Sequence, residues 1–324
     1  MITPGWPNKS NPSSSPFIFR QYQSLINHGI DVTVFNFKGN KNLMNYILAW
    51  VKIRILLRKN TYDLIHAQWG HTALLALYTK LPLVVTYRGM DLEGLVNKDG
   101  RYSTYGKILT RISKFTSTIA DEVIVVSKSL GSKLSRQDYT IIPSGIDLEL
   151  FKPLNKFESR KRLRLPQDKK LILFAAPRNH PRKRYDLAVE AVSILKEKFN
   201  CELIVCEKEK PDKVPLYMNA ADCLILTSIH EGSPNVVKEA LACNLPVVSV
   251  EVGDVKERQG NLKHFEICGD NPKQISQALD KILSNKSPNV NRKAVLELDE
   301  NIITEKLIGV YKKMVKDNIL KKAK

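Results

Sequence analysis

Two glutamates flank a turn between an apolar run and a helical pattern in the second half of the chain. Glu231 and Glu239 lie in LTSIHEGSPNVVKEALACNLPVVS, where LTS ends a strand-like run and NVVKEALACN has helical spacing. Ser233 followed by Pro234 is typical of an N-cap and a first helical residue, so we expect the helix to begin there. Both carboxylates would then stay near the carboxyl end of the strand, where open α/β sheets bind ligands.

The helix after this turn is predicted to be amphipathic. Asn235 and Glu239 share one face, away from the apolar stripe. The exposed backbone amides of residues 232–235, together with the helix dipole, suit an anionic ligand. The stripe that we expect to be buried consists of Val236, Val237, Ala240 and Leu241.

A basic turn follows the first strand-like run of the second half. The segment AAPRNHPRKRYDLAVEA is expected to form a strand end, a turn and a helix, and the turn carries Arg178, Arg182, Lys183 and Arg184. Cations at a strand end, with a helix N-terminus nearby, could bind a diphosphate from two sides. A solvated surface loop is the alternative interpretation of such a charge cluster.

These segments belong to an alternation of strand-like and helical patterns that fills both halves of the chain. Continuous apolar strands separated by helices indicate parallel sheets covered on both faces. The length of 324 residues and the hydrophobic content of 43% fit two domains of roughly 150 residues each. We therefore predict an α/β protein with two Rossmann-like, doubly wound domains. The strand-like runs are DVTVFNF, YDLIHAQ, LPLVVTYRG, ADEVIVVS, DYTIIPSG, KLILFAAPR, CELIVCEK, ADCLILTS and LPVVSVEVG.

Three segments need separate expectations. Only MIT precedes the turn PGWP, so either the first strand is very short or the start of the chain is missing. HTALLALYTK has helical spacing and is expected to form a helix. The polar segment LELFKPLNKFESRKRLRLPQDKK contains two prolines and lies between the halves, where we expect a linker.

The formal net charge of +18 favours polyanionic partners, whether nucleic acid, an anionic lipid surface or phosphorylated small molecules. Nucleic acid is not the expected partner, because the charges are dispersed and the chain has no zinc, helix-turn-helix or RNP-type signature. A nicotinamide oxidoreductase is excluded, because no G-x-G-x-x-G motif follows the first strand. The five cysteines have no metal-type spacing, so we expect free buried thiols and no metal site.

The apolar pattern predicts a cytoplasmic protein. No run reaches the roughly 18 apolar residues of a spanning helix, and MITPGWPNKS lacks the layout of a signal peptide. The run LMNYILAWVKIRILLRK combines apolar residues with Lys52, Arg54, Arg58 and Lys59, and could bind an anionic membrane surface. The alternative is an ordinary helix packed on the first sheet.

The glutamate motif and its surroundings resemble glycosyltransferase family 4. EGSPNVVKEALACNLPVV matches the E-x7-E signature of retaining glycosyltransferases, and Arg178 and Lys183 match the cations of the family's G-R-x4-K-G turn. IIPSGIDLELFKP is similar to the segment that closes the family's first domain. The likeness covers nearly the whole chain and implies the GT-B fold, in which two Rossmann-like domains face a cleft.

The chain also departs from the family pattern at turns that follow strands. Arg88 in VVTYRGMDL replaces the family's His, although Asp91 remains. The glycine-rich first turn is reduced to Gly5, and Arg184 replaces the Gly after Lys183. The sugar contact that the family makes from its His therefore does not transfer directly to Arg88.

The resemblance implies roles for individual residues. Glu239 would bind the ribose hydroxyls of the nucleotide, and Glu231 would contact hydroxyls of the transferred sugar. Arg178 and Lys183 would neutralise the leaving diphosphate. The departing phosphate oxygen would take the acceptor proton, so no protein base, metal or other cofactor is expected. Further donor-binding residues would be Gly232, Ser233, Pro234, Asn235 and Val236. Candidate sugar or acceptor contacts are Gly5, Arg88 and Asp91. His71, at an expected helix start, is a further candidate, and a structural hydrogen bond is the alternative interpretation for it.

The resemblance also implies a function for each half. Residues 1–148 would bind the acceptor, with a C-terminal helix at about 303–324 packing back on them, and residues 149–302 would bind the nucleotide sugar. We therefore expect a retaining, hexosyltransferase-like and metal-independent enzyme. It would move a sugar from a nucleotide-diphosphate sugar to a lipid-linked or oligosaccharide acceptor in cell-surface polysaccharide or glycolipid synthesis. A catalytically silent GT-B module that binds a glycan or a protein partner is the alternative.

Overall fold

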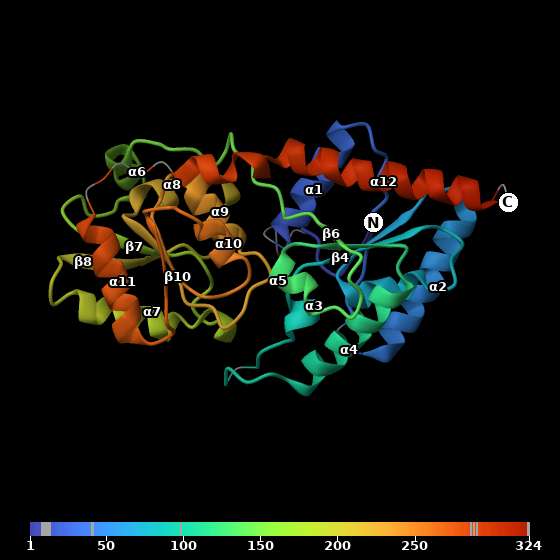
Figure 1. Cartoon of the computed structure of the whole chain (residues 1–324), viewed down its shortest axis with the longest axis horizontal. Helices are drawn as coiled ribbons and strands as arrows, with labels where there is room; N and C mark the ends of the chain where they lie inside the picture. Colours follow the sequence, from blue (N-terminus) through green and yellow to red (C-terminus); the bar gives the residue numbers. More distant parts are fainter. Residues whose placement is uncertain are drawn as a thin grey trace. The chain divides into compact units, whose positions relative to one another are not determined.

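The computed structural model describes residues 1–7, 14–39, 42–97, 99–285, 287, 289 and 291–322. The chain divides into two compact units (Figure 1). The first unit contains Met1–Leu95, Tyr102–Gly145 and Glu300–Lys324, and the second contains Val96–Arg101 and Ile146–Asp299. Each unit is built around its own parallel sheet.

The sheet of the first unit has the strand order β2-β1-β3-β4-β5-β6 and is parallel throughout. Its central strands are buried on both faces, as the continuous apolar runs in the sequence predict; Val85 and Val123, for example, are fully buried neighbours. The first strand is indeed very short. The strands are β1 (Ile2–Thr3), β2 (Phe35–Asn36), β3 (Ile65–Gln68), β4 (Leu83–Tyr87), β5 (Glu122–Val125) and β6 (Thr140–Ile141).

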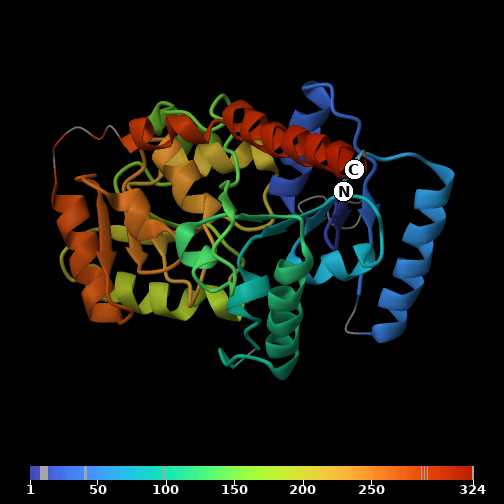
Figure 2. The same cartoon turned by 45° about the vertical axis from the view of Figure 1, so that its right-hand side comes forward.

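Helix α12 (Glu300–Lys322) belongs to the first unit, although it follows the second unit in the sequence. It lies beside α1 (Pro16–Asn27) in both views (Figures 1 and 2), and Thr304 Oγ1 donates a hydrogen bond to Ser24 Oγ at 2.8 Å. The Tyr311 hydroxyl lies 2.6 Å from Nδ1 of His66 in β3. Residues 323–324 of the predicted terminal helix lie outside the described residues.

The remaining helices of the first unit cover its sheet and the loops at the sheet's edge. HTALLALYTK forms only a short 3-10 helix, η1 (Gly70–Ala76), because Leu77 is extended and Tyr78 is left-handed at φ 61°.

No helix of the described part of the chain is both long and apolar enough to cross a bilayer. The other helices are α2 (Leu43–Lys59), α3 (Met90–Glu93), α4 (Thr104–Ile119) and α5 (Lys128–Gly131).

The parallel sheet of the second unit has the order β11-β10-β9-β7-β8. The chain runs from β7 to β8 on one side and then crosses to β9 on the other side of β7. The carboxyl ends of β7 and β9 therefore meet where the strand order reverses, which is the point at which open α/β sheets bind ligands. The strands are β7 (Lys170–Phe174), β8 (Cys201–Val205), β9 (Cys223–Leu226), β10 (Val247–Val250) and β11 (Phe265–Cys268).

Helices cover both faces of this second sheet. α7 and α11 pack together on one face, and α8 and α9 lie on the other (Figure 1). Two such parallel sheets confirm the predicted α/β class with two Rossmann-like domains. The helices are α6 (Lys156–Leu163), α7 (Tyr185–Leu195), α8 (Val214–Ala220), α9 (Asn235–Ala242), α10 (Val255–Gln259) and α11 (Pro272–Ser284), with 3-10 turns η2 (Pro181–Lys183), η3 (Pro211–Lys213) and η4 (Asn291–Leu298).

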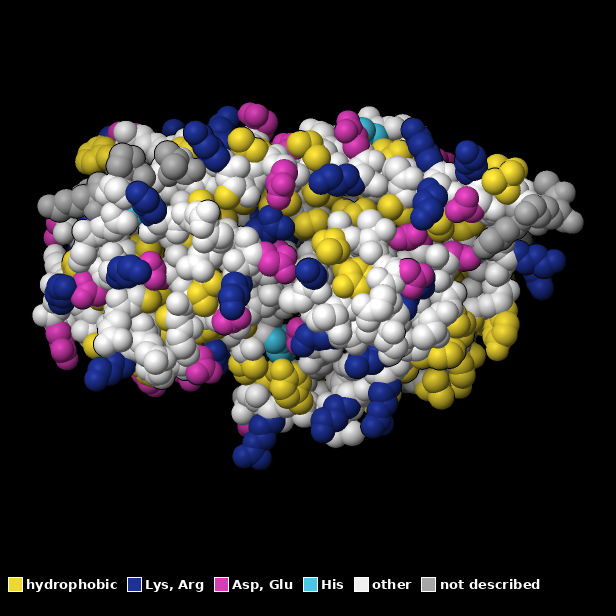
Figure 3. All heavy atoms as spheres, in the orientation of Figure 1, with side chains coloured by type: hydrophobic (Ala, Val, Ile, Leu, Met, Phe, Trp, Pro, Cys, Tyr) yellow, Lys and Arg dark blue, Asp and Glu magenta, His cyan; other side chains and the backbone are white. Residues whose placement is uncertain are grey.

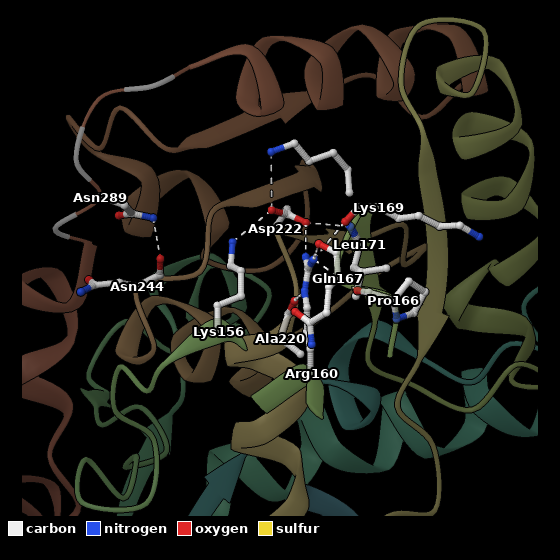
Figure 4. A network of polar contacts seen from close by, with 11 residues as sticks. Lys156, Arg160, Pro166, Gln167, Lys169, Leu171, Ala220, Asp222, Asn244 and Asn289 are labelled. Carbon is white, nitrogen blue, oxygen red and sulfur yellow. Dashed lines mark hydrogen bonds and ion pairs between the residues drawn. The ribbon is translucent and has the colours of Figure 1, made fainter. Parts of the chain in front are cut away.

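The segment predicted as a linker is instead folded into the second unit. It contains α6, and its Arg160 is only 4% exposed. The Arg160 guanidinium donates to the Ala220 carbonyl at 2.8 Å and to Asp222 Oδ2 at 2.7 Å (Figure 4). The linker prediction was wrong because a charged composition does not reveal that an arginine has buried acceptors elsewhere in the chain. Further acceptors are the carbonyls of Pro166, Gln167 and Lys169.

Candidate active site

The turn between β9 and α9 carries the first of the two glutamates. α9 begins at Asn235, and its N-cap is Pro234 without a side-chain hydrogen bond, so the predicted Ser233 cap was wrong. The Ser233 hydroxyl instead donates to Asp254 Oδ2 at 2.7 Å. This hydroxyl is therefore oriented by a charge-assisted bond to a buried carboxylate.

Glu239, the second of the two glutamates, lies on the side of α9 opposite the buried stripe. Val237, Ala240 and Leu241 are fully buried. At about 100° per residue, Glu239 lies roughly 160° around the helix from Leu241, and Asn235 shares that face. Three of the four predicted stripe residues are thus buried; Val236 is only half-buried, and Lys238 is buried as well.

The carboxylate of Glu239 is close to the end of β8. Burial, and then the charge of Glu239, raise the pKa of the Cys243 thiol to about 12. Burial and the charges of Glu209 and Glu239 raise the pKa of Cys206 to about 12 as well, and Cys206 directly follows β8. These thiols therefore stay protonated at physiological pH.

Glu231 is held at one oxygen by three donors. Its Oε1 lies 2.6 Å from Lys183 Nζ and 2.7 Å from Arg182 Nη1, and it accepts a hydrogen bond from Ser228 Oγ at 2.7 Å. The three charged side chains are 11–15% exposed. The structure thus brings together the glutamate turn after β9 and the basic turn after β7, which the sequence placed at separate strand ends.

The electrostatics of this cluster leave an excess of positive charge. Burial alone would raise the pKa of Glu231, but Lys183 and Arg182 lower it to about 2 through their charges and hydrogen bonds. Burial lowers the pKa of Lys183, Glu231 opposes this effect, and Arg182 adds to it. Two cations therefore share one ionised carboxylate at neutral pH, an arrangement that attracts an anion.

Arg184 links the same two turns through its side chain, and its own backbone is strained. It has left-handed backbone angles at φ 50°, a conformation that costs a non-glycine residue roughly 1–2 kcal/mol. Its guanidinium offsets this cost by donating to the Thr227 carbonyl at 2.6 Å, and Thr227 Oγ1 donates back to the Lys183 carbonyl at 2.7 Å. The left-handed backbone explains why glycine suits this position in the resembled family.

The loop after β10 packs against the glutamate turn. Gly253 has φ +57°, and a Cβ there would lie 3.0 Å from the carbonyl oxygens of Glu231 and Gly232. Glycine is therefore required by both backbone conformation and space. This contact fixes the height of the turn above the sheet.

Arg178, which was predicted to bind the diphosphate with Lys183, does not contact Glu231. Its side chain is 55% exposed, its Nε lies 3.1 Å from Glu207 Oε1, and its backbone amide donates to Glu207 Oε2 at 2.9 Å. Glu207 follows β8, so Arg178 is drawn to the β8 side of β7. Arg182, which stands beside Lys183 in η2, occupies the place at the glutamate instead.

Two residues predicted to contact sugar or acceptor lie together after β4 of the first unit. Asp91 is 3% exposed and accepts backbone hydrogen bonds from Gly89, Arg88 and Gly70 at 2.9–3.3 Å. Burial raises the pKa of Asp91, and these backbone donors partly offset the rise. Asp91 thus holds the turn in shape.

Arg88 lies in a polar pocket of the same unit, where no carboxylate of the described residues pairs with its guanidinium. The guanidinium donates to Gln68, Gln21 and Ser144 at 2.6–3.0 Å and stacks over the Phe17 ring at 5.0 Å. Burial lowers the pKa of Arg88 to about 10, although the charge of Asp91 opposes this shift. A cation among neutral acceptors can complement an anionic group of a ligand.

The other two predicted contacts follow β1 and β3, at the same edge of this sheet as Arg88. His71 is half-buried in η1, and burial lowers its pKa to about 4, so the ring is neutral at physiological pH. Gly5 accepts a hydrogen bond from Thr3 Oγ1 at 2.9 Å, and a side chain there would collide with Ser15. Close packing therefore explains the glycine.

Two family models match the sequence. Residues 1–150 match the model described as Glycosyltransferase Family 4, and residues 204–285 match the model described as Glycosyl transferases group 1. The second match contains the whole of the glutamate turn and α9. The first match covers the sheet of the first unit.

Individual proteins agree with these matches. The chain is 28% identical to "Putative teichuronic acid biosynthesis glycosyltransferase TuaC" of Bacillus subtilis, over 72% of this chain and 64% of the relative. It is 24% identical to the N,N'-diacetylbacillosaminyl-diphospho-undecaprenol alpha-1,3-N-acetylgalactosaminyltransferase of Campylobacter jejuni, over 80% of this chain and 76% of the relative. The match thus spans less than two thirds of the first relative's length.

The fold has a solved counterpart. Sucrose-phosphate synthase from Thermosynechococcus elongatus superposes with a TM-score of 0.78 at 16% identity, over 92% of both chains. Two parallel α/β units in this order define the GT-B architecture. The chain belongs to the glycosyltransferases of the family 4 type.

Proposed function

We propose that the protein is a retaining glycosyltransferase that moves a sugar from a nucleotide-diphosphate sugar to an acceptor. The observation that carries the proposal is the cluster in which Lys183 and Arg182 share the carboxylate of Glu231. Its excess positive charge suits a leaving diphosphate, and a preorganised cation stabilises the negative charge that develops as the sugar departs. Glu239, half-buried on the side of α9 opposite Leu241, suits ribose hydroxyls.

In this mechanism the charged groups act on the leaving group and need no protein base. The departing phosphate oxygen takes the acceptor proton as the new glycosidic bond forms on the same face of the sugar. Glu231 stays ionised at physiological pH because its pKa is near 2, so it accepts hydrogen bonds from sugar hydroxyls rather than donating a proton. The backbone N–H groups within 232–235, of which Pro234 has none, and the helix dipole would complete the anion site.

The same cations support a metal-independent reaction. Lys183 and Arg182 would supply at the diphosphate the positive charge that a bound divalent ion supplies in other phosphoryl sites. No added cofactor is then needed beyond the nucleotide sugar.

The acceptor would be a lipid-linked or oligosaccharide substrate in cell-surface polysaccharide or glycolipid synthesis. Two relatives support this class, because one name refers to teichuronic acid biosynthesis and the other to a diphospho-undecaprenol acceptor. The four residues proposed to contact sugar or acceptor are Gly5, Arg88, Asp91 and His71, all at one edge of the first sheet. An anionic acceptor would complement Arg88.

Thermal unfolding with a panel of nucleotide diphosphates and their sugars tests the proposal. A ligand present at a hundred times its Kd stabilises a protein by about 2.7 kcal/mol, so the correct nucleotide should stand out clearly. Transfer from the corresponding sugar should continue in excess chelator. A panel without any stabilising member would reject the donor site, and loss of transfer in chelator would reject metal independence.

Replacing Glu239 by Ala is expected to weaken binding of the selected nucleotide at least about tenfold. A hydrogen bond to a charged group contributes about 1.5–3 kcal/mol, and tenfold in Kd corresponds to 1.4 kcal/mol. The fold should stay intact, because Glu239 lies opposite the buried stripe. Glu190→Ala, on an exposed position of α7, is the matched control. Unchanged nucleotide affinity of the Glu239 variant in calorimetry would remove this assignment.

The second part of the proposal is that α2 attaches the protein to the cytoplasmic face of an anionic membrane. Only Ala49 and Ile53 of this helix are buried. Its exposed apolar side chains gather on the surface over α2 (Figure 3). A contiguous apolar surface beside cations is typical of an interfacial helix. The exposed apolar residues are Leu43, Met44, Ile47, Leu48, Trp50, Val51 and Ile55.

The basic side chains of α2 lie toward its C-terminal end. Lys52, Arg58 and Lys59 are exposed, whereas Arg54 is half-buried and stacks over the Trp50 ring at 4.6 Å. Each Lys or Arg near an anionic surface contributes about 1 kcal/mol, and the apolar residues add to that attraction. The expected attachment is reversible and weakens as salt rises.

Sedimentation with vesicles checks this attachment. The protein should bind phosphatidylserine-containing vesicles and not phosphatidylcholine vesicles, and binding should fall when Lys52, Arg58 and Lys59 are all changed to Glu. A control variant with Lys161, Lys196 and Lys273 changed to Glu has the same net charge, but its substitutions lie on exposed sites of the second unit. Equal losses in the two variants, or no binding at low salt, would refute the role of α2.

A further inference from the structure

We propose that Arg182, and not Arg178, is the second cation that binds the donor diphosphate together with Lys183. This inference rests on the proposed function, because it assigns a contact within the proposed donor site. The spacing in PRNHPRKRYDL favours Arg178 as the partner of Lys183. The position of each guanidinium relative to the sheet favours Arg182.

Strand order separates the two arginines. β7 lies between β8 and β9, and the basic turn at the end of β7 can lean toward either neighbour. Arg178 leans toward β8, where Glu207 holds both its Nε and its backbone amide. Arg182 leans toward β9, where its Nη1 donates to the His230 carbonyl at 2.8 Å and pairs with Glu231.

The donor's own connectivity decides which side the diphosphate takes. A diphosphate links the ribose to the transferred sugar, and the proposed ligands of these two parts are Glu239 and Glu231. Glu239 acts on the Cys206 thiol at the end of β8, and Glu231 stands on the β9 side next to Lys183. The phosphate bonded to the sugar, from which the sugar departs, therefore lies nearest to the Glu231 end, within the reach of Arg182.

Burial and charge also distinguish the two arginines. The Arg182 side chain is 14% exposed and that of Arg178 is 55% exposed. Glu207 neutralises Arg178 in a pair of its own, whereas Arg182 shares Glu231 with Lys183, so one positive charge of that cluster is not balanced by Glu231. Desolvated cations interact with an anion more strongly than solvent-exposed ones.

The backbone holds Arg182 ready for this contact. The Arg182 carbonyl accepts from the Ile229 amide at 2.8 Å, which ties η2 to the glutamate turn. The buried Nε of Arg182 makes no hydrogen bond to any described residue, so the guanidinium has a donor left for a ligand. Arg182 thus has a fixed position, residual charge and an unused donor.

The experiment compares Arg182→Met with Arg178→Met in the full chain. Titration calorimetry would measure the Kd of UDP, GDP and ADP, of the nucleoside of whichever one binds, and of inorganic pyrophosphate. For Arg182→Met we expect binding of the nucleoside diphosphate and of pyrophosphate to weaken at least about tenfold, with nucleoside affinity unchanged. Arg178→Met should change each Kd by less than about twofold. Arg182→Lys, which keeps the charge, should recover part of the lost affinity.

Each other result has a definite meaning. A larger loss in Arg178→Met than in Arg182→Met would overturn the inference and leave the donor site standing. Equal loss of nucleoside and diphosphate binding in Arg182→Met, with no recovery in Arg182→Lys, would show a structural role and also overturn it. Wild-type protein that binds none of the three nucleotides would reject the proposed function itself, which the variants alone do not do.

Discussion

Replacing Lys183 by Met should lower turnover at saturating donor by at least about 100-fold, the loss seen when one preorganised donor to a developing charge is removed. Lys183 Nζ lies 2.6 Å from Glu231 Oε1, and Arg182 would still pair with that carboxylate in the variant. The fold should therefore persist. The loss should appear in kcat, because the contact gains strength as the diphosphate takes up charge.

Initial rates of sugar transfer measure this effect, with the nucleotide sugar selected by thermal stabilisation as donor. Lys198→Met is the matched control, because Lys198 is 61% exposed and pairs with Asp280 on the surface of the second unit. Its turnover should equal that of the wild type. Wild-type turnover in the Lys183 variant would refute the leaving-group role, and a lowered melting temperature would instead show that the fold had changed.

The largest expected effect on stability comes from Arg160. Replacing it by Met should lower the free energy of unfolding of the second unit by about 3–5 kcal/mol, the usual result when one partner of a buried ion pair is removed. Of the described groups, Lys156, Lys170 and the Leu171 amide would remain near the Asp222 carboxylate, and the buried Ala220 carbonyl would lose its guanidinium donor. Lys156→Met should cost less than about 1 kcal/mol, because that lysine is 49% exposed.

Two intrinsic probes separate the units in a urea titration. All five cysteines lie in the second unit, and four are buried, so thiol labelling follows its unfolding. All three tryptophans lie in the first unit, so their fluorescence follows the other. Arg160→Met should move the thiol midpoint to lower urea much further than the fluorescence midpoint. Equal thiol midpoints for the Arg160 and Lys156 variants would contradict the role of Arg160.

Local patterns in the sequence were sufficient to predict both sheets and the placement of Glu239 on the face of α9 opposite Leu241. Strand-like runs and helical spacing depend on neighbours a few residues away, and a helix of known period places Glu239 opposite Leu241 wherever that helix lies. The cap at Ser233 was predicted wrongly because the acceptor of its hydroxyl, Asp254, belongs to the loop after another strand. Such an acceptor has no signal in the local sequence.

The lack of long-range information in the local sequence also explains the wrong linker prediction and the choice of Arg178 over Arg182. The segment around Arg160 reads as a linker because the partners that justify burying an arginine, Ala220 and Asp222, lie far along the chain. The choice between Arg178 and Arg182 depends on which strands flank β7, and spacing within the turn contains no information on strand order. In the sequence, the observed cluster was indicated only by a second cation, Arg182, directly before the motif lysine, Lys183.

The return of α12 to the first unit has a consequence for synthesis of the chain. All strands of the second sheet lie between Lys170 and Cys268, so that sheet can form as soon as its segment is made. The first unit must wait for α12, and at about 5–20 residues per second the ribosome reaches its end roughly ten to forty seconds after Gly145. During that interval the surface around Ser24 and His66 stays uncovered, and the nascent first unit is a substrate for chaperones until α12 emerges.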